Sequence, residues 1–397
     1  MFKLRPYQQE AVDAALDFFQ FGTAKDRPII IAPTAAGKSI YIASIVKELS
    51  GGVLVIQPSK ELLEQNFGKF ELYGGQAKIY SASMNQKEVG QVTFATIGSI
   101  VKQSDLFSHV KYILIDECHL VPPDPGSMFM RFLLKLPGVK VIGLTATAFR
   151  LKRYNDPFTG EPYSQINLLP RERPRYFNRF LHITQIKELY DQKYLSPVRW
   201  IPLEWNNGML KYNSTGAEFS DKSMDDAMKQ QKIYERIPGL IRQSIEKGRK
   251  YRLVFVKNVA DAELLAMQVP DSACVSAETK KKDRDNILRK FKAGEIKTVF
   301  NVGVLTVGFD FPALDCIIIA RPTMSLALYI QMVGRGIRLF NGKADCAVVD
   351  MCGNLSRFCK MEDLIYTMDD VGGWIITDGS KQLSGVRLST NYELQKL

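Results

Sequence analysis

Short apolar runs alternate with segments of helical spacing along most of the chain, and this alternation constrains the fold more than any other feature. In residues 1–150 the runs are PIIIAP, GVLVIQP, QVTFAT, KYILIDE and VKVIGLTAT. Continuous β-branched runs of this kind are typical of parallel strands buried on both faces. The stretches between them, such as KSIYIASIVKEL, have the spacing of helices. The alternation predicts an α/β sheet with right-handed crossover connections.

The same pattern resumes at about residue 200 and predicts a second α/β domain with the runs RLVFVK, IKTVFNVG, LDCIIIARP and DCAVVDM. A segment rich in Pro, Gly and charge separates the halves. Its stretch RERPRYFNRF fits either a nucleic-acid grip, by phosphate contact and stacking, or a solvated linker. We expect domain 1 over 1–150, a basic connecting segment over 151–199, domain 2 over 200–355 and a tail over 356–397 with a helix and a β-hairpin around VGGWIITDGS.

Charge narrows the class of partner. The chain has 53 Lys and Arg against 42 Asp and Glu, a net charge of +11. This excess favours a polyanionic partner such as nucleic acid, although an uneven solvated surface produces it too. No apolar run reaches the ~20 residues of a membrane-spanning helix, and the six cysteines form no C-x-x-C pair. We expect a cytoplasmic protein with reduced thiols, no structural zinc and no membrane contact.

The stretch RPIIIAPTAAGKSIYIAS, residues 27–44, places a Gly-Lys-Ser triplet between an expected strand and an expected helix. Such a turn offers phosphate a set of backbone N–H groups and a lysine, while the hydroxyl of Ser39 can bind Mg²⁺. Ala32 stands where the usual pattern has its first glycine, so the triplet alone also fits a plain strand–turn–helix with a solvated Lys38. The residues expected to bind nucleotide here are consecutive: Thr34, Ala35, Ala36, Gly37, Lys38 and Ser39.

A pair of carboxylates completes this site. Asp116 ends the run KYILID and Glu117 follows it. Open α/β sheets bind ligands at the carboxyl ends of their strands. There Asp116 can hold Mg²⁺, and Glu117 can accept a proton from an attacking water. Two surface carboxylates that cap a strand are the alternative, but the Gly-Lys-Ser triplet upstream favours a site for ATP and Mg²⁺.

Four further motifs follow one order along the chain: LRPYQQEAV at 4–12, DECH at 116–119, TAT at 145–147 and QMVGRGIR at 331–338. In this order they resemble superfamily 2 helicases and translocases of the DExH type. Together with NVGVLTVGFDFPALDCIIIARPT they are most similar to the RadD-like DNA-repair ATPases, over about residues 3–355. The resemblance implies two tandem RecA-like domains with mostly parallel sheets, plus a small C-terminal tail.

The chain departs from the family pattern in three places. Ala35 replaces a glycine usual in the phosphate-binding loop, and Ala148 replaces the proline usual after TAT. Neither change removes a charge or a metal ligand, so they bear on loop flexibility rather than on hydrolysis. RadD-like proteins also carry a cysteine-rich, zinc-binding C-terminal extension. We expect none here, and partner contacts of that extension are not transferred.

The resemblance also implies roles for residues outside the two motifs derived above. Arg335 and Arg338, with Gln331, would act on the γ-phosphate from domain 2 as arginine fingers. The additional nucleotide-binding residues implied are Arg5, Gln8, Gly308 and Asp310. Those implied to couple the nucleotide site to nucleic acid are His119, Thr145 and Thr147. Those implied to contact nucleic acid are Ser59, Lys60, Thr96, Lys257, Asn301 and Thr306, for several of which strand-end capping is the alternative.

The resulting hypothesis is an ATP-dependent DNA helicase or translocase that moves on or remodels DNA in repair, recombination or replication. Its DNA would be single-stranded or branched, with RNA less favoured, and a bacterial or phage form would be nucleoid-associated. One alternative is a nucleic-acid-stimulated ATPase that acts in branch migration, annealing or RNA remodelling without processive unwinding. Another is an ATP-gated DNA-binding accessory protein. The sequence indicates no protein partner.

Overall fold

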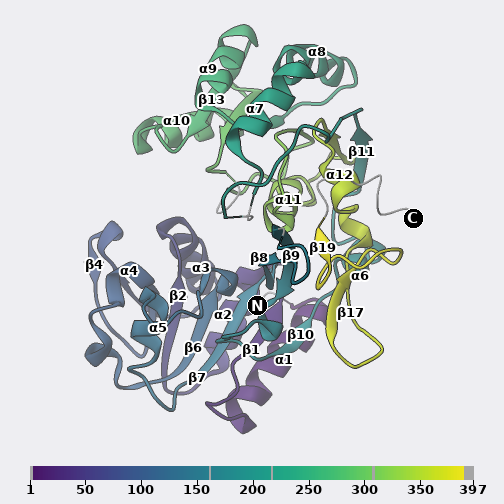
Figure 1. Ribbon diagram of the computed structural model, residues 1–397. Helices are drawn as coiled ribbons and strands as arrows, with labels where there is room; N and C mark the ends of the chain where they lie inside the picture. The colour runs from purple at the N-terminus through teal and green to yellow at the C-terminus, as the bar shows by residue number, and fades with distance from the viewer. Residues whose placement is uncertain (1–2, 161, 216–217, 306–308, 389–397) are drawn as a thin grey trace. The chain divides into compact units, whose positions relative to one another are not determined.

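A computed structural model gives the architecture of the chain (Figure 1). It describes residues 3–160, 162–215, 218–305 and 309–388. The chain divides into two compact units: unit 1 is Met1–Arg150 with Asn167–Gln185, and unit 2 is Leu151–Ile166 with Ile186–Leu397. Each unit is built on a mostly parallel sheet with helices, which confirms the predicted α/β class.

Unit 1 contains an eight-stranded sheet in the order β10-β1-β7-β6-β2-β5-β3-β4. Neighbouring strands run parallel except β3 and β4, which are antiparallel. The inner strands β1, β2 and β7 have almost every residue buried, as their continuous apolar runs predict. The strand bounds are β1 (Pro28–Ile31), β2 (Gly52–Gln57), β3 (Lys78–Ser81), β4 (Gln86–Lys87), β5 (Val92–Thr96), β6 (Val110–Asp116), β7 (Lys140–Thr145) and β10 (Arg179–Ile183).

The helices of unit 1 connect these strands, and α2 packs against both α1 and α3. The longest of them, α1, also contacts β10 at the edge of the sheet. The bounds are α1 (Pro6–Phe21), α2 (Lys38–Glu48), α3 (Lys60–Leu72), α4 (Ile97–Ile100) and α5 (Met128–Leu133), with short 3₁₀ turns at Ala82–Met84, Ser104–Phe107, Cys118–Leu120 and Leu169–Arg171.

The expected connecting segment 151–199 is divided between the two units. Its strand β10 extends the sheet of unit 1 by pairing in parallel with β1. The rings of Tyr176 and Phe177 are only 6% and 2% exposed, and the guanidinium of Arg27 lies 4.5 Å from the ring centre of Tyr176. Both rings belong to the core of unit 1, so the alternative that they stack on nucleic-acid bases is wrong.

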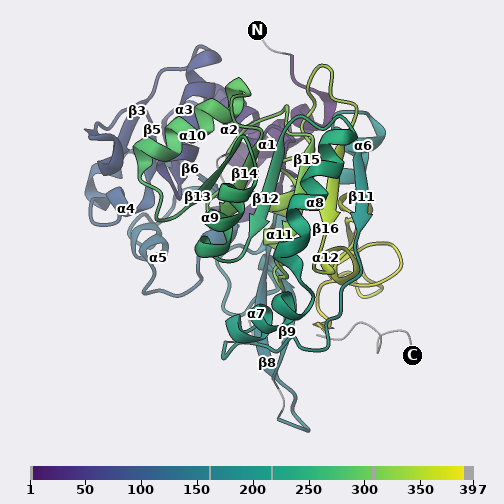
Figure 2. The same cartoon turned by 90° about the horizontal axis from the view of Figure 1, so that it is seen from above.

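Unit 2 contains a six-stranded, fully parallel sheet in the order β11-β16-β15-β12-β14-β13. Helices α8 and α9 run over one face of it (Figure 2). There Ile237 and Ile241 of α8 and Leu265 of α9 share a core with Val254 and Ile318 of the sheet. The strand bounds are β11 (Val198–Pro202), β12 (Arg252–Val256), β13 (Ser272–Ser276), β14 (Thr298–Val302), β15 (Cys316–Ala320) and β16 (Cys346–Asp350). The helix bounds are α6 (Ile186–Asp191), α7 (Asp221–Gln230), α8 (Ile233–Glu246), α9 (Val259–Gln268), α10 (Lys281–Ala293), α11 (Leu326–Val333) and α12 (Asn354–Arg357).

The tail is tied to unit 2 by two small sheets. The expected hairpin is present, because β17 (Ile365–Met368) pairs antiparallel with β18 (Trp374–Thr377) after a 3₁₀ turn at Met361–Asp363. Farther on, β19 (Arg387–Leu388) joins β9 (Pro162–Leu168), which neighbours β8 (Phe149–Asn155) in a three-stranded sheet. Residues of the expected linker therefore hold residues of the tail. None of the helices in the described ranges is both long and apolar enough to span a bilayer.

We expect Gly143→Ala to lower the free energy of unfolding by about 1–3 kcal/mol, because it overpacks the centre of unit 1. Gly143 lies on β7, and a Cβ atom there would come within 2.7 Å of Cys118 and of Phe177. Chemical unfolding of the full chain measures the effect. The matched control is Gly68→Ala on α3, where an added Cβ meets nothing within 4 Å and helix propensity predicts a gain of up to ~1 kcal/mol. A neutral Gly143→Ala would contradict this packing.

Candidate nucleotide-binding site

The Gly-Lys-Ser triplet lies where β1 turns into α2, as predicted. Gly37 is the residue before the helix and has φ 87°, a left-handed conformation that favours glycine. Upstream, the amide of Ala36 donates to the carbonyl of Pro33 (3.0 Å), and the amide of Ala32 donates to Thr145 on β7 (3.0 Å). The first backbone N–H groups of a helix lack intrahelical acceptors and lie at its positive end. The loop therefore presents amides and a lysine to an anion.

The start of α1 closes over this loop. The side-chain amide of Gln8 and the hydroxyl of Tyr7 both donate to the carbonyl of Ala36, at 3.0 and 3.1 Å. Gln8 in turn accepts from the backbone amide of Arg5 at 3.0 Å. A Cβ atom on Gly37 would lie 2.9 Å from the amide nitrogen of Gln8. Residue 37 is thus restricted to glycine by its backbone and by its neighbour. Gln8 contacts the loop and Arg5 contacts Gln8, while their binding of nucleotide stays a prediction.

Ala35 is the unusual residue of the loop. Its φ is 69°, in the left-handed region, where an L-residue with a Cβ atom is strained by about 1–2 kcal/mol. The family pattern has glycine at this position, so the substitution keeps the glycine backbone and adds strain. Ala32, by contrast, lies outside the left-handed region and replaces its glycine without that cost.

Lys38 lies between the two carboxylates of DECH. Its ammonium nitrogen is 2.8 Å from Oδ1 of Asp116, which ends β6, and it also pairs with Oε1 of Glu117. Burial by itself favours the neutral amine, but the charges of Asp116 and Glu117 outweigh it and raise the pKa of Lys38 above its ordinary value. The lysine is therefore a fixed positive charge at the base of the loop.

Glu117 has a second set of neighbours. Its Oε2 lies 3.4 Å from Nδ1 of His119 and 3.5 Å from the hydroxyl of Thr145, and His119 and Thr145 contact each other at 2.8 Å. The hydroxyl of Thr145 also accepts from the amide of Thr147 (3.0 Å). Burial alone raises the pKa of Glu117, but Lys38 and His119 outweigh it and hold that pKa well below the ordinary range. The carboxylate is ionised, and the three residues predicted to couple the sites form a chain leading away from it.

Two supporting residues were not predicted from the sequence. Asn66 on α3 is 1% exposed, and its side-chain amide donates to Oδ2 of Asp116 at 2.8 Å. Arg150 donates to the carbonyl of His119 at 2.8 Å and pairs with the buried Glu172 at 2.5 Å. The sequence signal for Asn66 is a polar residue on the apolar face of a helix, which a search for motifs does not detect.

Predicted residues of unit 2 lie around the loop that follows α11. Arg338 forms an ion pair with Asp310. The guanidinium of Arg335 donates to the carbonyls of Phe309 (2.5 Å) and Gln331 (3.3 Å), so it supports the loop from within. The predicted Gly308 and Thr306 lie outside the described residues.

The nucleic-acid candidates of unit 1 follow β2 and β5, at the same edge of the sheet as the nucleotide loop. Ser59 begins α3 and accepts from the amide of Leu62 at 3.3 Å. Lys60 pairs with Glu64 at 3.2 Å. Thr96 is 8% exposed, and its hydroxyl lies 2.8 Å from the hydroxyl of Ser99. Helix capping accounts for Ser59, and the other two already have protein partners.

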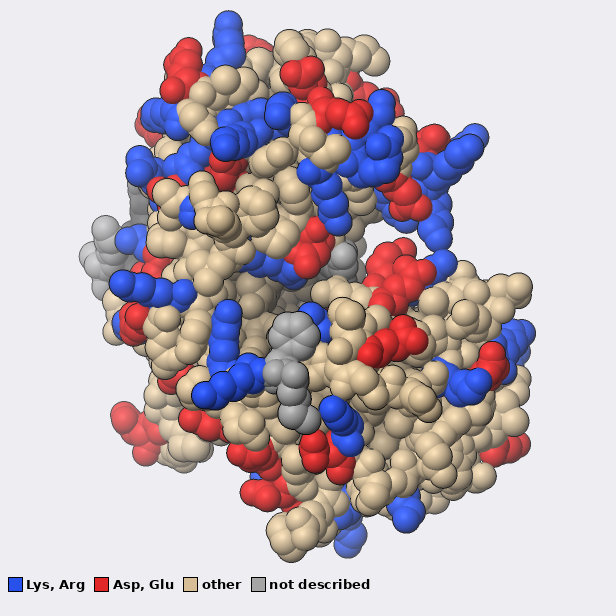
Figure 3. Space-filling view, turned by 180° about the vertical axis from the view of Figure 1, so that it is seen from behind, with Lys and Arg blue, Asp and Glu red and all other residues tan. Residues whose placement is uncertain are grey.

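The candidates of unit 2 are similarly occupied. Lys257 pairs with Asp225 at 2.9 Å and with Asp221 at 3.3 Å. Asn301 is fully buried and accepts from the amide of Leu305 at 2.9 Å. Elsewhere on unit 2, Lys and Arg side chains gather over the part that contains α7 to α10, in the upper part of Figure 3. The basic excess of the sequence is thus concentrated there on the face shown.

The candidate metal ligands of this site are few. Across the described ranges, no group of three or more His, Cys, Asp or Glu side chains could hold a metal. The six cysteines are free thiols. A Mg²⁺ ion needs fewer protein ligands when phosphate and water supply the rest, and hydroxyl and carboxylate oxygens suit it. The hydroxyl of Ser39, the next residue of α2, and the carboxylate of Asp116, which pairs with Lys38, fit that requirement.

We expect Ala35→Gly to raise the free energy of unfolding by up to ~1 kcal/mol, because relief of left-handed strain exceeds the added entropy of the unfolded chain. The control is Ala36→Gly, one residue on, where the backbone is not left-handed and glycine costs ~0.5–1 kcal/mol. Chemical unfolding measures both. A loss of stability in both variants would contradict the strained backbone at residue 35.

Comparison with known protein families gives two matches, one in each half of the chain. Residues 1–150 match the family described as "Type III restriction enzyme, res subunit". Residues 231–340 match "Helicase conserved C-terminal domain". Among solved structures, the DNA-bound Type ISP restriction-modification enzyme LlaBIII aligns with 88% of this chain and 28% of its own (TM-score 0.63, 16% identity). A fragment of a "putative HsdR subunit of a type I restriction enzyme" from Vibrio vulnificus aligns with 87% and 64% (TM-score 0.63, 20% identity).

Curated relatives include "Putative ATP-dependent helicase IRC3" of Saccharomyces cerevisiae, 27% identical over 88% of this chain and 51% of its own length. The "51.5 kDa protein" of a Lactococcus phage is 24% identical over 78% and 62%. "DNA 3'-5' helicase XPB" of Kineococcus radiotolerans is 22% identical over 78% and 52%. The chain thus spans between half and two thirds of the length of these relatives. With both family matches in order and the loop geometry above, the chain has the core of the superfamily 2 helicases, with both of its RecA-like domains.

Proposed function

We propose that this chain is an ATP-dependent DNA helicase or translocase, which couples ATP hydrolysis to movement on DNA or to its remodelling in repair, recombination or replication. One observation carries the proposal: Lys38 lies at the start of α2 with its charge balanced by Asp116 and Glu117. A lysine held by two acidic groups beside free helix amides is prepared to exchange a carboxylate for a phosphate.

Nucleotide binding follows from this arrangement. The triphosphate of ATP would lie along the loop of residues 34–39, where the amide of Ala36 is already used by Pro33, and Lys38 would move its ion pairing to the phosphates. Gln8, which already contacts the loop, and Arg5, which contacts Gln8, would lie on the side where the base binds. Ser39 and Asp116 would hold Mg²⁺, which would neutralise charge on the phosphates. Asn66 keeps Asp116 oriented for that task.

Hydrolysis then depends on Glu117. Once Lys38 pairs with phosphate, the ionised carboxylate loses its strongest partner and can accept a proton from water. His119 and Thr145 keep contact with its other oxygen and orient it. Because these two residues continue to Thr147, a change at Glu117 is passed to the end of β7. This is the route by which nucleotide state reaches the rest of unit 1.

Unit 2 supplies the remaining charge. Arg338, after exchanging Asp310 for the γ-phosphate, acts as the arginine finger, a contribution of about 10³–10⁵ in rate. Arg335 holds the loop through the carbonyl of Phe309. Hydrolysis thus requires residues of both units, which makes the state of ATP a determinant of domain position.

DNA as the substrate rests on charge and on relatives. The net charge of +11 and the basic surface of unit 2 favour a polyanion. The printed names of the XPB relative and of the LlaBIII structure refer to DNA. RNA remodelling, annealing without processive unwinding and an ATP-gated accessory role are the alternatives that experiment must separate.

We expect ATP hydrolysis by the purified chain to be stimulated at least tenfold by one form of DNA, since the finger is placed only in the closed state. Steady-state hydrolysis is measured alone and with single-stranded DNA, duplex, fork, junction and RNA. Stimulation by RNA and by none of the DNA forms would show that the substrate is RNA rather than DNA. ATP binding without turnover on any nucleic acid would favour the accessory protein.

Glu117→Gln is expected to lower turnover by at least 100-fold while ATP and DNA binding persist, because the amide cannot accept the proton. Rate and affinity are measured on the same preparation. Glu48→Gln, an exposed carboxylate at the end of α2, is the control and should hydrolyse ATP at the normal rate. Unchanged turnover in Glu117→Gln would remove Glu117 as the base.

A further inference from the structure

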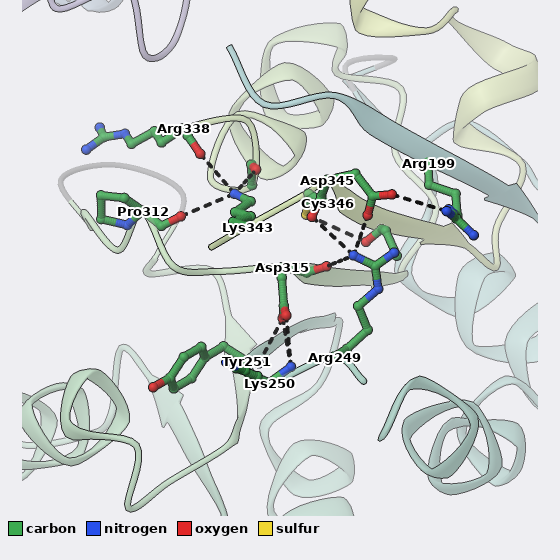
Figure 4. Close-up of polar contacts among 12 residues, drawn as sticks. Arg199, Arg249, Lys250, Tyr251, Pro312, Asp315, Arg338, Lys343, Asp345 and Cys346 are labelled. Carbon is green, nitrogen blue, oxygen red and sulfur yellow. Dashed lines mark hydrogen bonds and ion pairs between the residues drawn. The ribbon is translucent and has the colours of Figure 1, made fainter. Parts of the chain in front are cut away.

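Lys343 lies in the turn before β16, and its ammonium group contacts three main-chain carbonyls (Figure 4). The acceptors are the carbonyl oxygens of Gly336 at 2.5 Å, Arg338 at 3.0 Å and Pro312 at 3.2 Å. An ammonium group has three N–H donors and no acceptor. All three donors are therefore used, and none is directed at a side chain.

The three acceptors come from two segments that the sequence separates. Gly336 and Arg338 belong to the loop after α11, whereas Pro312 belongs to the connection between β14 and β15, two residues after Asp310. One lysine thus ties together the backbones that carry the two members of the Arg338–Asp310 ion pair. A neutral or apolar side chain at residue 343 could not join them in this way.

The turn that carries Lys343 is itself anchored. Arg249 pairs with the side chain of Asp345 and donates to the carbonyls of Asp345 (3.1 Å) and Asp315 (3.3 Å). Arg199 adds a second pair to Asp345 at 3.3 Å, and Asp315 accepts from the amide of Tyr251 at 2.8 Å. Figure 4 shows these residues lying together, from β11 and from the segments just before β12, β15 and β16. Lys343 therefore projects from a fixed edge of the sheet.

The loop has little freedom on its other side. A Cβ atom on Gly336 would lie 2.4 Å from Sγ of Cys346 and 2.9 Å from Ile317, so the backbone is pressed against the sheet. Burial lowers the pKa of Lys343, although Cys346, Asp315 and Asp345 act in the opposite direction. Because all three donors of this partly buried lysine bind backbone carbonyls, Lys343 acts as a structural clamp that holds the two segments together rather than as a surface charge.

We propose that Lys343 is the positioning residue of the finger loop: it holds the backbone of Arg338 at a fixed height above the sheet and locks it to the β14–β15 connection. The inference rests on the proposed role of Arg338 in ATP hydrolysis and deepens it. Without the clamp, Arg338 keeps its charge but loses its defined position. A misplacement of about 1 Å can cost ~10²-fold in rate.

The test compares Lys343→Met with Arg338→Ala and with the double variant. Lys343→Met is expected to lower the DNA-stimulated kcat by about 10- to 100-fold, with a much smaller change in KM for ATP. In the Arg338→Ala background, the same change should have little further effect, because both act through one guanidinium. Lys250→Met, an exposed lysine at the same edge of the sheet, controls for the lost charge and should retain wild-type kcat.

Two outcomes would overturn the proposal. One is a wild-type kcat in Lys343→Met. The other is the same fold-loss with and without Arg338, which would assign Lys343 to general stability. Lys343→Gln, whose shorter neutral side chain has only two N–H donors for the three carbonyls, replaces Lys343→Met if the latter does not fold.

Hydrogen exchange gives a readout that does not depend on activity. In Lys343→Met the amides of residues 309–316 and 334–341 should exchange faster, while the same segments in Lys250→Met match the wild type. Unchanged exchange in both segments would overturn the clamp. If the wild-type chain hydrolyses no ATP with any nucleic acid, the proposed function is wrong. If Lys343→Met nevertheless exchanges faster than the wild type in these two segments, the structural role of Lys343 still holds.

Discussion

The structure of unit 1 depends on the contact of Lys38 with Asp116 and Glu117. These charges come from the β1–α2 loop and from the end of β6, with β7 between the two strands in the sheet. Removing one partner of a buried ion pair typically costs about 3–5 kcal/mol, because the other charge is left unpaired. The pair therefore fixes the loop against the sheet before any nucleotide binds. It also explains why a loop with three alanines can keep a defined shape.

The order of the strands extends this constraint to the rest of the site. Because β1, β7 and β6 are parallel neighbours, the nucleotide loop, Thr145 and Asp116 lie at one edge of the sheet. Gly143 lets Cys118 and Phe177 pack against β7, which places the backbone of DECH close to that edge. Thr145 then reaches both Glu117 and His119 without a change of register. The packing of Cys118 and Phe177 against Gly143 in the core therefore also sets the positions of Glu117, His119 and Thr145 in the site.

Sequence reasoning succeeded where the chemistry is local. The phosphate loop and DECH each need adjacent residues on a strand end, so their patterns predict the fold and the presence of Lys38, Asp116 and Glu117 in one site, whereas the ion pairs among these three residues are seen only in the structure. It could not find Asn66, Lys343 or the place of β10, because each depends on contacts between residues far apart in the chain. It also could not show that Ala35 has a left-handed backbone, since alanine usually signals the opposite. Neither a contact between distant residues nor a strained backbone can be recognised from the type of the residue that takes part in it.

The β14–β15 connection lies between the nucleic-acid candidate Asn301 and the Arg338–Asp310 ion pair of unit 2. At its start, after a strand's carboxyl end, Asn301 caps the amide of Leu305. At its far end it reaches the amino edge of the sheet, where Asp310 pairs with Arg338 and Pro312 accepts from Lys343. The two described ends of this connection are thus held by different contacts, that of Asn301 at one end and that of Lys343 at the other. Under the role proposed for Lys343, its contacts with Pro312 and Arg338 fix this far end against the loop after α11, so the position of Arg338 depends on a residue that belongs to none of the sequence motifs.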